Sequence, residues 1–484
     1  MTRETLGSRL GFILISAGCA IGIGNVWRFP WLAGRYGGAW FVLFYALFLV
    51  LLGLPVMTME FSMGRAARTS PILMYRNVGH PGWSWHGVMS FAGCTLLMMY
   101  YTTVAGWMFS YFWMSASGSL AGVDAGSAGA AFGKLLGDPV RQVVPMGLVV
   151  AAGFGILAIG LRGGLERVTK WMMLGLLGLM AALAVHSEAL PGSGAGVKYF
   201  LVPNAANVAA NGGWGRLVVE AMNQAFFTLS LGIGSMAIFG SYIGRDRALL
   251  GESVRVTALD TVVAMAAGFI VIPACFAFAV EPGAGPGLLF VTLPAVFGHM
   301  PGGRFWGALF FLFMSFAAFS TVLAVFENIL ACFRDLTGLS RRSAAAVCAV
   351  AVFLLSLPCA LGWSALSGFH PLGPDSGVLD LEDFVVSNLL LPIGALAYVV
   401  FCTRRIALFR AYKPGWGWGW RAFREEANRG EGLKVPDAWP FRFYVGVVLP
   451  LVIAALLVIG LADKFGLVGR IRALLVRLDW IAAA

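Results

Sequence analysis

A polar interruption lies inside the first apolar stretch of the chain, at "SAGCAIGIGNVWRFP", Ser16 to Pro30. Three glycines in this stretch are followed by Asn25 and Arg28. A polar side chain and a charge at membrane depth are costly and usually functional. An unwound helix exposes carbonyl oxygens that bind a cation, and the N–H groups of the next half-helix attract an anion. The segment therefore predicts a site for an ion or a zwitterion.

A simpler interpretation of the glycines stays open at this point. Gly18 and Gly22 form a GxxxG pair, which is common where membrane helices pack closely. Close packing explains the glycines but leaves Asn25 and Arg28 without a role. A dinucleotide-binding loop is excluded, because the spacing does not fit GxGxxG and no soluble strand precedes it.

The composition indicates an integral membrane protein built from helices. Of the 484 residues 59% are hydrophobic and 12% are charged, and the mean hydropathy is +0.82. Such a chain has too little polar surface to cover a water-soluble globule. The apolar stretches are long enough for spanning helices and do not alternate apolar with polar residues, which argues against a transmembrane β-barrel. The start "MTRETLGSRLGF" lacks a signal-peptide pattern, so we expect the first helix to be retained. We expect the protein to lie in the cell (inner) membrane.

Eleven spans are predicted, and the charges between them give the orientation. Basic residues follow spans 2, 4, 6, 8 and 10, so the N-terminus is expected to be cytoplasmic. The same bias explains the net charge of +11 without nucleic-acid binding. Eleven spans would place the C-terminus outside, yet the tail "IRALLVRLDWIAAA" is basic, and we interpret it as an amphipathic helix on the membrane surface. The predicted spans are 9–36, 39–64, 87–115, 140–160, 167–186, 214–243, 256–280, 303–334, 343–363, 382–403 and 440–463.

A second interruption occurs in the sixth span, in "NQAFFTLSLGIGSM". Gly232 and Gly234 repeat the Gly-Ile-Gly of the first span. Spans 1 and 6 are five apart, so their orientations are inverted. Two glycine-broken helices at corresponding positions of inverted halves indicate the midplane site of a secondary transporter. The seven cysteines have neither metal-ligand spacing nor an obvious pair in an outward loop, so no disulfide is expected.

Two sequence motifs resemble the neurotransmitter:sodium symporter (solute carrier 6-type) family. "SRLGFILISAGCAIGIGNVWRFPWLAGRYGGAWFVLFYALFLVLLGLPVMTMEFSMGR" is similar to its first two helices, and "FFTLSLGIG" is similar to its sixth. The similarity runs from residue 8 to about residue 460. It implies an all-α polytopic fold, the five-plus-five inverted repeat (LeuT-type) with helices 1 and 6 broken, and the eleven spans resemble a bacterial subgroup of amino-acid transporters. The implied divisions are an N-terminal gate segment (1–8), the first repeat (9–186), an extracellular loop (187–213), the second repeat (214–403), a basic cytoplasmic loop (404–439), helix 11 (440–463) and a tail (464–484).

The resemblance implies two sodium sites. One would be formed by the carbonyl of Ala20, the side chains of Asn25 and Thr228, Asp260 and the substrate carboxylate. Hard cations prefer oxygen ligands of this kind. The other would be formed by the carbonyls of Gly18, Ile21 and Ala317 and the hydroxyls of Ser320 and Thr321. Without the resemblance, Ser and Thr in a membrane helix more often bond to their own backbone.

Chloride dependence is not expected. Tyr45, Gln224 and Thr228 match the anion shell of chloride-dependent relatives, but Ala264 stands where those relatives have Ser. Asp260 stands where many members have Asn. We therefore expect Asp260 to supply the negative charge; the alternative is an Asp that is paired structurally within the bundle.

The substrate pocket implied by the resemblance contains no charged side chain, which favours a zwitterion with an apolar side chain. Its amine would meet carbonyls of the broken helices, and its carboxylate would meet sodium and the Tyr101 hydroxyl. Taken alone, Tyr101 reads equally well as a packing aromatic. The pocket residues are Cys19, Ala20, Gly22, Gly24, Leu97, Tyr101, Phe227, Thr228, Ser230, Ile233, Thr321 and Val325.

Two charged gates are also implied by the resemblance. Arg28 and Asp383 would close the outer side above Phe227. Arg3 and Asp335, with Tyr242 nearby, would close the inner side. Opposite charges that pair in one state and hydrate in the other suit alternating access. Leu6 stands where the family often has Trp, so the inner gate departs from the family pattern.

Other functional classes fit less well. An intramembrane enzyme needs a nucleophile and base or metal ligands inside the spans, and the five histidines (His80, His86, His186, His299, His370) fall in or near connections. A channel would favour rings of like residues from an oligomer. We therefore predict a monomeric, non-enzymatic, sodium-coupled importer of neutral, hydrophobic L-amino acids in a lipid bilayer. A sodium-dependent amino-acid sensor of the same fold, or an importer of another small zwitterion, stays open.

Overall fold

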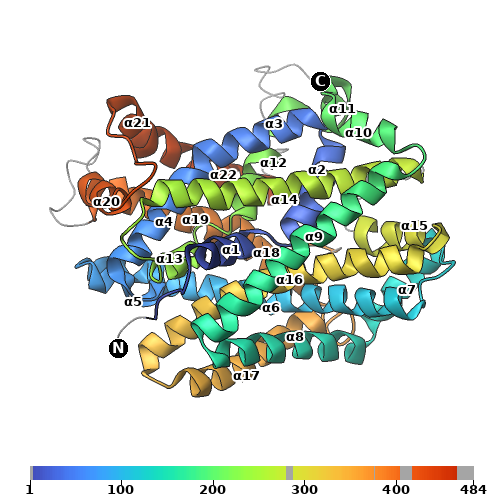
Figure 1. Ribbon diagram of the computed structural model, residues 1–484, viewed down its shortest axis with the longest axis horizontal. Coiled ribbons are helices and arrows are strands. Elements are labelled where there is room, and N and C mark those ends of the chain that lie inside the picture. Colours follow the sequence, from blue (N-terminus) through green and yellow to red (C-terminus); the bar gives the residue numbers. More distant parts are fainter. Residues whose placement is uncertain (1–3, 279–286, 375, 404–416, 466–484) are drawn as a thin grey trace.

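The computed structural model describes residues 4–278, 287–374, 376–403 and 417–465, which form a bundle of helices (Figure 1). The predicted spans 2–5 and 7–11 each correspond to a helix in this part of the chain that is long and apolar enough to cross a membrane. Arg3, the basic loop from residue 404 to 416 and the tail from residue 466 lie outside the described residues. The nine spanning helices run over Ala39–Ala67, Pro81–Ser117, Pro139–Ile159, Leu161–Ala189, Leu249–Ala277, Gly303–Thr337, Arg341–Ala360, Val378–Thr403 and Trp439–Ala462.

The first span is bent in its middle, as its glycines predicted. Helix α1 (Arg9–Ala20) begins after Ser8, whose hydroxyl accepts a hydrogen bond from Gly11 N at 3.0 Å. It ends where Ile21 takes an extended backbone, with ψ of 100°. The chain resumes as η1 (Gly24–Arg28) and α2 (Phe29–Arg35), and the two halves meet at 59°.

The sixth span is broken into α12 (Gly213–Thr228) and α13 (Ser235–Gly240). Three residues between them have positive φ: Ser230 at 50°, Gly232 at 99° and Gly234 at 73°. Glycine adopts this region without steric cost, whereas serine does so with strain. The six-residue unwound segment, residues 229–234, therefore follows from the Gly-x-Gly of the sequence.

The two longest helices, α6 (Ser84–Ser117) and α16 (Gly303–Thr337), pack against each other along the centre of the bundle (Figure 1). Their sequences are apolar on nearly all sides, which is typical of buried helices. Helix α1 packs against α16, α14 and α9 and so lies inside the bundle. The remaining spans are α3 (Ala39–Phe48) continued by η2 (Leu49–Gly53) and α4 (Leu54–Ala67), α8 (Pro139–Ile159), η4 (Leu161–Glu166) with α9 (Arg167–Ala189), α14 (Leu249–Ala277), α17 (Arg341–Ala360), α18 (Val378–Phe384) with η6 (Val385–Leu390) and α19 (Leu391–Thr403), and α21 (Trp439–Phe443) with η8 (Tyr444–Val448) and α22 (Leu449–Lys464).

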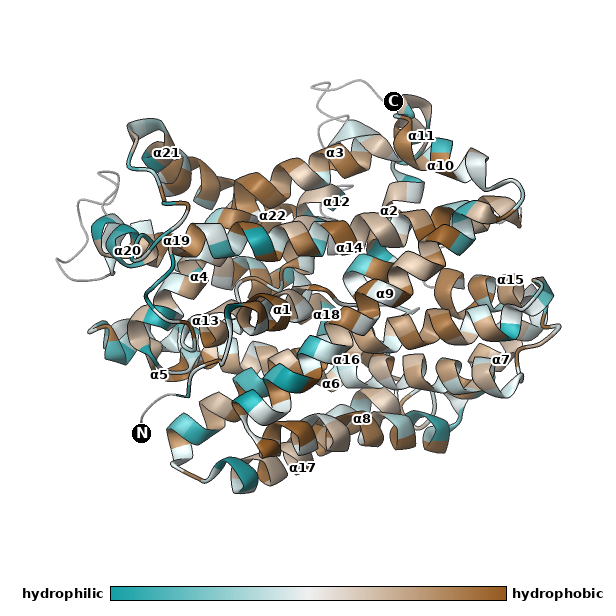
Figure 2. Ribbon diagram, in the orientation of Figure 1, coloured by the Kyte–Doolittle hydropathy of each residue, from teal (hydrophilic) through white to brown (hydrophobic). Residues whose placement is uncertain are grey.

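The outer faces of the bundle are apolar. Large hydrophobic side chains such as Leu43, Leu148, Val262 and Leu451 are exposed on them. Figure 2 shows hydrophilic residues gathered around α5 and α20 at one end of the bundle. This pattern identifies a multi-pass membrane protein. The third span begins with η3 (Pro81–Trp83). Short helices lie between the spans: α5 (Pro71–Asn77), α7 (Ala125–Gly137), α10 (Ser193–Leu201), α11 (Ala205–Ala210), η5 (Leu288–Thr292), α15 (Leu293–His299) and α20 (Gly419–Ala427).

Candidate functional site

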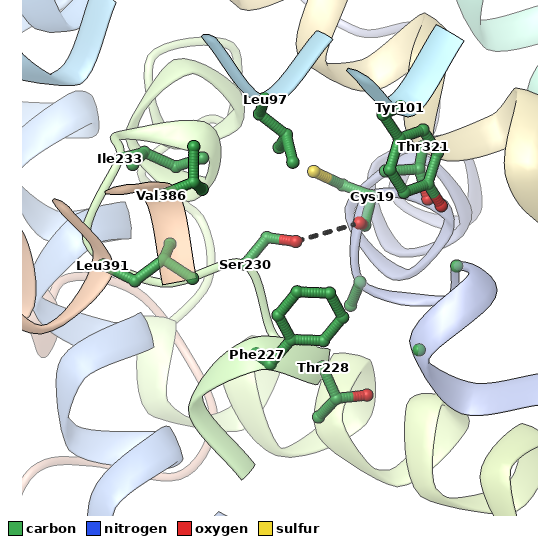
Figure 3. Close-up of a pocket in the computed structure, with 13 residues that line it drawn as sticks. Cys19, Leu97, Tyr101, Phe227, Thr228, Ser230, Ile233, Thr321, Val386 and Leu391 are labelled. Carbon is green, nitrogen blue, oxygen red and sulfur yellow. Dashed lines mark hydrogen bonds between the residues drawn. The ribbon is translucent and has the colours of Figure 1, made fainter. Parts of the chain in front are cut away.

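The breaks in the first and sixth spans face each other across a cavity. Figure 3 shows Ile233, Val386 and Leu391 on one side of it, Tyr101 and Thr321 on the other, and Phe227 between them and Thr228. The Ser230 hydroxyl, from the sixth span, donates to the carbonyl of Cys19, from the first, at 3.4 Å. The lining residues are Cys19, Ala20, Gly22, Gly24, Leu97, Tyr101, Phe227, Thr228, Ser230, Ile233, Thr321, Val386 and Leu391.

This lining agrees with the sequence prediction except at one wall. Val325 was predicted to line the cavity but is not among the lining residues; it is buried in α16. Val386 and Leu391 were missed, and they come from the tenth span. None of the lining residues is a lysine, arginine, aspartate or glutamate, so the cavity suits a ligand without net charge.

Glycine is required where the first span meets the cavity. A Cβ atom on Gly22 would lie 2.6 Å from the Tyr101 hydroxyl oxygen and 2.9 Å from the Thr321 hydroxyl oxygen. The Tyr101 oxygen accepts a hydrogen bond from Ile23 N at 3.1 Å, so the hydroxyl keeps its own proton to donate. The absence of a side chain at Gly22 therefore leaves the space in which the Tyr101 hydroxyl reaches the helix break.

A buried carboxylate lies beside the cavity. Asp260, on α14, accepts hydrogen bonds from Asn25 Nδ2 at 2.8 Å, Thr228 Oγ1 at 3.2 Å and Tyr45 Oη at 3.3 Å. All four side chains are buried. In the described part of the chain no lysine or arginine forms an ion pair with Asp260. An ionised carboxylate in a dry interior needs a cation, so this cluster fits the hard cation that its oxygens suit.

Gln224 is separate from that cluster. Its Nε2 donates to the carbonyl of Gly24 at 3.1 Å, and its Oε1 is buried with no hydrogen-bond partner in the described part of the chain. Of the three residues matched to an anion shell, the structure thus brings Tyr45 and Thr228 to Asp260, whereas Gln224, on α12, bonds to Gly24 of the first span.

A second group of oxygens lies where α1 meets α16. The Thr321 hydroxyl lies 3.2 Å from the carbonyls of Gly18 and Ile21, and the Ser320 hydroxyl lies 2.9 Å from the carbonyl of Ala317. Ser320 Oγ is also 3.5 Å from Ile21 O. Three carbonyls and two hydroxyls converge here, and the carbonyls of Gly18 and Ile21 lie at the break that ends α1, where regular helical hydrogen bonds stop. Such a group of acceptors fits a small cation, and the five residues are those the sequence predicted together.

A transition-metal site is not indicated. In the described residues no group of three or more His, Cys, Asp and Glu side chains could hold a metal ion. The oxygen clusters contain carbonyls, hydroxyls and one carboxylate, which are ligands for hard cations.

The predicted outer gate pair is not formed in this structure. Arg28 lies 3.8 Å from Glu220 on α12, and its guanidinium is 5.1 Å from the ring centre of Phe227. Asp383 instead accepts hydrogen bonds from Tyr100 at 3.0 Å and from Ser387 at 2.8 Å. Glu220 was missed because it lies two helical turns before the recognised motif.

The predicted inner residues take part in separate contacts. Asp335 accepts a hydrogen bond from Ser70 N at 2.8 Å, and Tyr242 donates to Glu327 at 2.6 Å. Glu327 also pairs with Arg341. Arg3, its predicted partner, lies outside the described residues, so the pair with Asp335 stays a prediction.

Two broken helices facing one cavity, inside a bundle of further spans, define a secondary transporter. A sequence model of the sodium:neurotransmitter symporter family matches residues 3–127 and 135–369. The chain therefore belongs to the sodium:neurotransmitter symporter family. Its fold is the five-plus-five inverted repeat with an eleventh helix, as predicted, and it is a sodium-dependent transporter.

Relatives and a solved structure agree with this assignment. The uncharacterized sodium-dependent transporter YhdH of Bacillus subtilis is 33% identical over 401 residues, which cover 83% of this chain and 87% of that protein. An uncharacterized sodium-dependent transporter of Methanocaldococcus jannaschii is 28% identical over 480 residues, or 94% of this chain and 90% of that protein. The crystal structure of MhsT in complex with L-phenylalanine matches with a TM-score of 0.81 and 32% identity, over 94% of this chain and 99% of MhsT.

Proposed function

We propose that the protein imports neutral, hydrophobic L-amino acids together with sodium, by alternating access and without chloride. The observation that carries this proposal is the charge balance around the cavity. An apolar, uncharged cavity adjoins two oxygen clusters, and one of these contains a buried carboxylate, Asp260. The complex of the similar protein MhsT with L-phenylalanine supports an amino-acid substrate.

Each oxygen cluster would hold one sodium ion. The first would use Asn25, Thr228 and Asp260 with the carbonyl of Ala20 and the carboxylate of the substrate. The second would use the carbonyls and hydroxyls between α1 and α16. Sodium neutralises the buried carboxylates and gives the coupling between ion and substrate its physical basis.

The substrate would be oriented by backbone as much as by side chains. Its amine would meet the carbonyls of Ala20, Phe227 and Thr228, with Ser230 nearby. Its carboxylate would reach the Tyr101 hydroxyl and the N–H groups near the first break. The side chain would then point toward Ile233, Val386 and Leu391, which form the apolar wall in Figure 3.

The gates would open and close around this site in turn. Arg28 would exchange between Glu220, its partner in this structure, and Asp383 across the outer opening. Asp335 and Tyr242 would belong to the inner gate, with Arg3 from the segment outside the described residues. We place the transporter in the cell (inner) membrane as a monomer, with a cytoplasmic N-terminus and the domain divisions predicted above.

The test is uptake of labelled amino acids into proteoliposomes under an inward sodium gradient, with gluconate in place of chloride. Accumulation of one or more neutral amino acids supports the proposal, and loss of uptake without the sodium gradient confirms coupling. Binding of an amino acid without uptake would instead favour a sensor. Uptake only when chloride is restored would contradict the chloride-independent mechanism.

Enlarging the apolar wall should change which side chain is preferred. Ile233→Ala and Leu391→Ala each remove about three methylene-sized groups, so we expect the ratio of uptake for aromatic over small aliphatic amino acids to rise by about tenfold. Competition of a labelled substrate by a panel of unlabelled amino acids measures this ratio. Val325→Ala is the matched control, because Val325 is buried but does not line the cavity. An unchanged profile in both wall variants would place the side-chain pocket elsewhere.

A methyl group at the first break should weaken binding. Gly22→Ala forces the Tyr101 or Thr321 side chain to move, because the added carbon would overlap both hydroxyls. We expect about tenfold weaker amino-acid affinity, measured by scintillation proximity binding. Gly155→Ala is the control, since a Cβ there meets nothing within 4 Å. Wild-type affinity in Gly22→Ala would contradict a substrate site at this break.

A further inference from the structure

His86 lies behind the unwound segment of the sixth span and is not among the cavity-lining residues. The sequence placed it in a connection, but in the structure it belongs to the first turn of α6 and is fully buried. Its Nε2 is 3.3 Å from the carbonyl oxygen of Gly232, and its Nδ1 is 2.5 Å from the hydroxyl oxygen of Tyr75. The ring thus connects α5 to the broken helix.

The chemistry of the two partners fixes which nitrogen carries the proton. A carbonyl oxygen only accepts hydrogen bonds, so Nε2 must carry the hydrogen that it donates to Gly232. In a neutral imidazole Nδ1 is then the acceptor, and the Tyr75 hydroxyl donates to it. Tyr75 therefore holds the His86 ring in the tautomer and orientation that the Gly232 carbonyl needs.

The N–H group of Gly232 is held from another helix. It donates to a carboxylate oxygen of Glu60 on α4, whose second oxygen accepts from Met236 N at 3.3 Å. Gly232 has a φ of 99° and lies between two helices, so neither of its backbone polar groups has a partner from regular helix. Glu60 and His86 together satisfy both groups, which buried backbone requires.

We propose that His86 is a positioning residue for substrate and sodium binding, acting through the carbonyl of Gly232. The inference rests on the proposed function, because the segment it holds presents Ser230 and Ile233 to the cavity. Without its donor the buried Gly232 carbonyl is left unpaired, and the segment populates other conformations. Apparent affinity falls in proportion to the fraction of molecules that keep the binding conformation.

The test compares three variants in purified full-length protein. His86→Leu removes the donor, His86→Gln keeps an N–H near the position of Nε2, and Tyr75→Phe removes the hydroxyl that orients the ring. We expect His86→Leu to weaken sodium-dependent amino-acid binding by about tenfold and to raise the half-saturating sodium concentration by about tenfold. In His86→Gln the amino-acid affinity should recover to within about threefold of the wild-type value, and in Tyr75→Phe it should fall by about threefold. His299→Leu, at an exposed histidine, is the matched control.

A second readout separates this inference from the proposed function. Hydrogen–deuterium exchange of the segment from residue 229 to 236 reports its order whatever ligand the cavity takes. His86→Leu should speed exchange there by about tenfold, and His86→Gln should restore it. If the wild type binds no amino acid but the variants show this exchange pattern, the proposed function is refuted, while the ordering of the segment by His86 is supported.

Two results would overturn the inference. Equal losses in the Leu and Gln variants would mean that His86 acts by shape, through contacts such as its edge packing on Tyr398, rather than as a donor. Wild-type exchange and affinity in Tyr75→Phe and in His86→Leu would mean that the segment stays ordered without the hydrogen bond from His86. If His86→Leu does not fold, the other two variants decide. Weaker substrate affinity in Tyr75→Phe together with near-normal affinity in His86→Gln supports the positioning role of His86, and any other pair of results contradicts it.

Discussion

Asp260→Asn should lower sodium-driven uptake in chloride-free buffer by about 100-fold. The substitution keeps the size of the side chain but removes the negative charge that would balance a sodium ion. Leaving one member of a buried charge pair uncompensated costs about 3–5 kcal/mol, which corresponds to a loss of at least two orders of magnitude in affinity. Uptake into proteoliposomes at a sodium concentration well below saturation, with gluconate as the external anion, measures the loss.

Chloride should restore part of that uptake. In the variant, Tyr45 and Thr228 keep hydroxyl donors that no longer face a carboxylate, and these donors suit an anion. We expect a chloride dependence that wild type lacks. Asp246→Asn, at an exposed carboxylate, controls for general effects of lost charge. Full uptake by Asp260→Asn without chloride would show that Asp260 is a structural hydrogen-bond acceptor only.

The helix breaks were the most predictable part of the fold. A glycine pair inside an apolar span has a local cause and a local effect, because positive φ at Gly232 and Gly234 needs no long-range contact to be recognised. The eleven-span pattern follows similarly from the length of apolar runs. These features depend on residues that are neighbours in the chain, so they can be predicted from the sequence.

The wall of the cavity was less predictable. Val386 and Leu391 come from a span whose widened turn, η6, brings two apolar side chains to the site. They look like any other lipid-facing or core residue in an apolar span. Val325 was expected to face the cavity from α16, yet its side chain is buried away from it. When a helix is apolar on every side, its hydrophobic pattern does not show which face points toward the cavity.

Partner choice among charged residues was also beyond the sequence. Arg28 could pair with either of two carboxylates of similar chemistry, Glu220 or Asp383. In this structure the spacing of the helices brings Glu220 to it. His86 was assigned to a connection because it lies beside a turn and the polar residues of its neighbourhood. Its role depends on Gly232, 146 positions away, and on a carbonyl left free by a helix break.

Removing the hydroxyl of Ser320 should raise the sodium concentration needed for half-maximal substrate binding by about tenfold. Ser320→Ala leaves the carbonyls of Ile21 and Ala317 in place but removes an oxygen that lies 3.5 and 2.9 Å from them. A hydrogen-bonding or ligand contact to a charged group contributes about 1.5–3 kcal/mol, so one lost ligand should cost tenfold or more. Ser320 does not line the cavity, which keeps substrate contacts unchanged. Substrate binding titrated with sodium measures the shift.

Ser315→Ala is the control that makes this test specific. Ser315 is on the same helix and is also buried, and its hydroxyl donates to the carbonyl of Phe311 at 2.7 Å, its one partner among the described residues. It should therefore keep the wild-type sodium dependence. Thr321→Val should exceed the effect of Ser320→Ala, because the Thr321 hydroxyl lies near three carbonyls, while Thr321→Ser should keep the wild-type value. Equal shifts in Ser315→Ala and Ser320→Ala would mean that these hydroxyls only bond to their own helix, and the second sodium site would have to lie elsewhere.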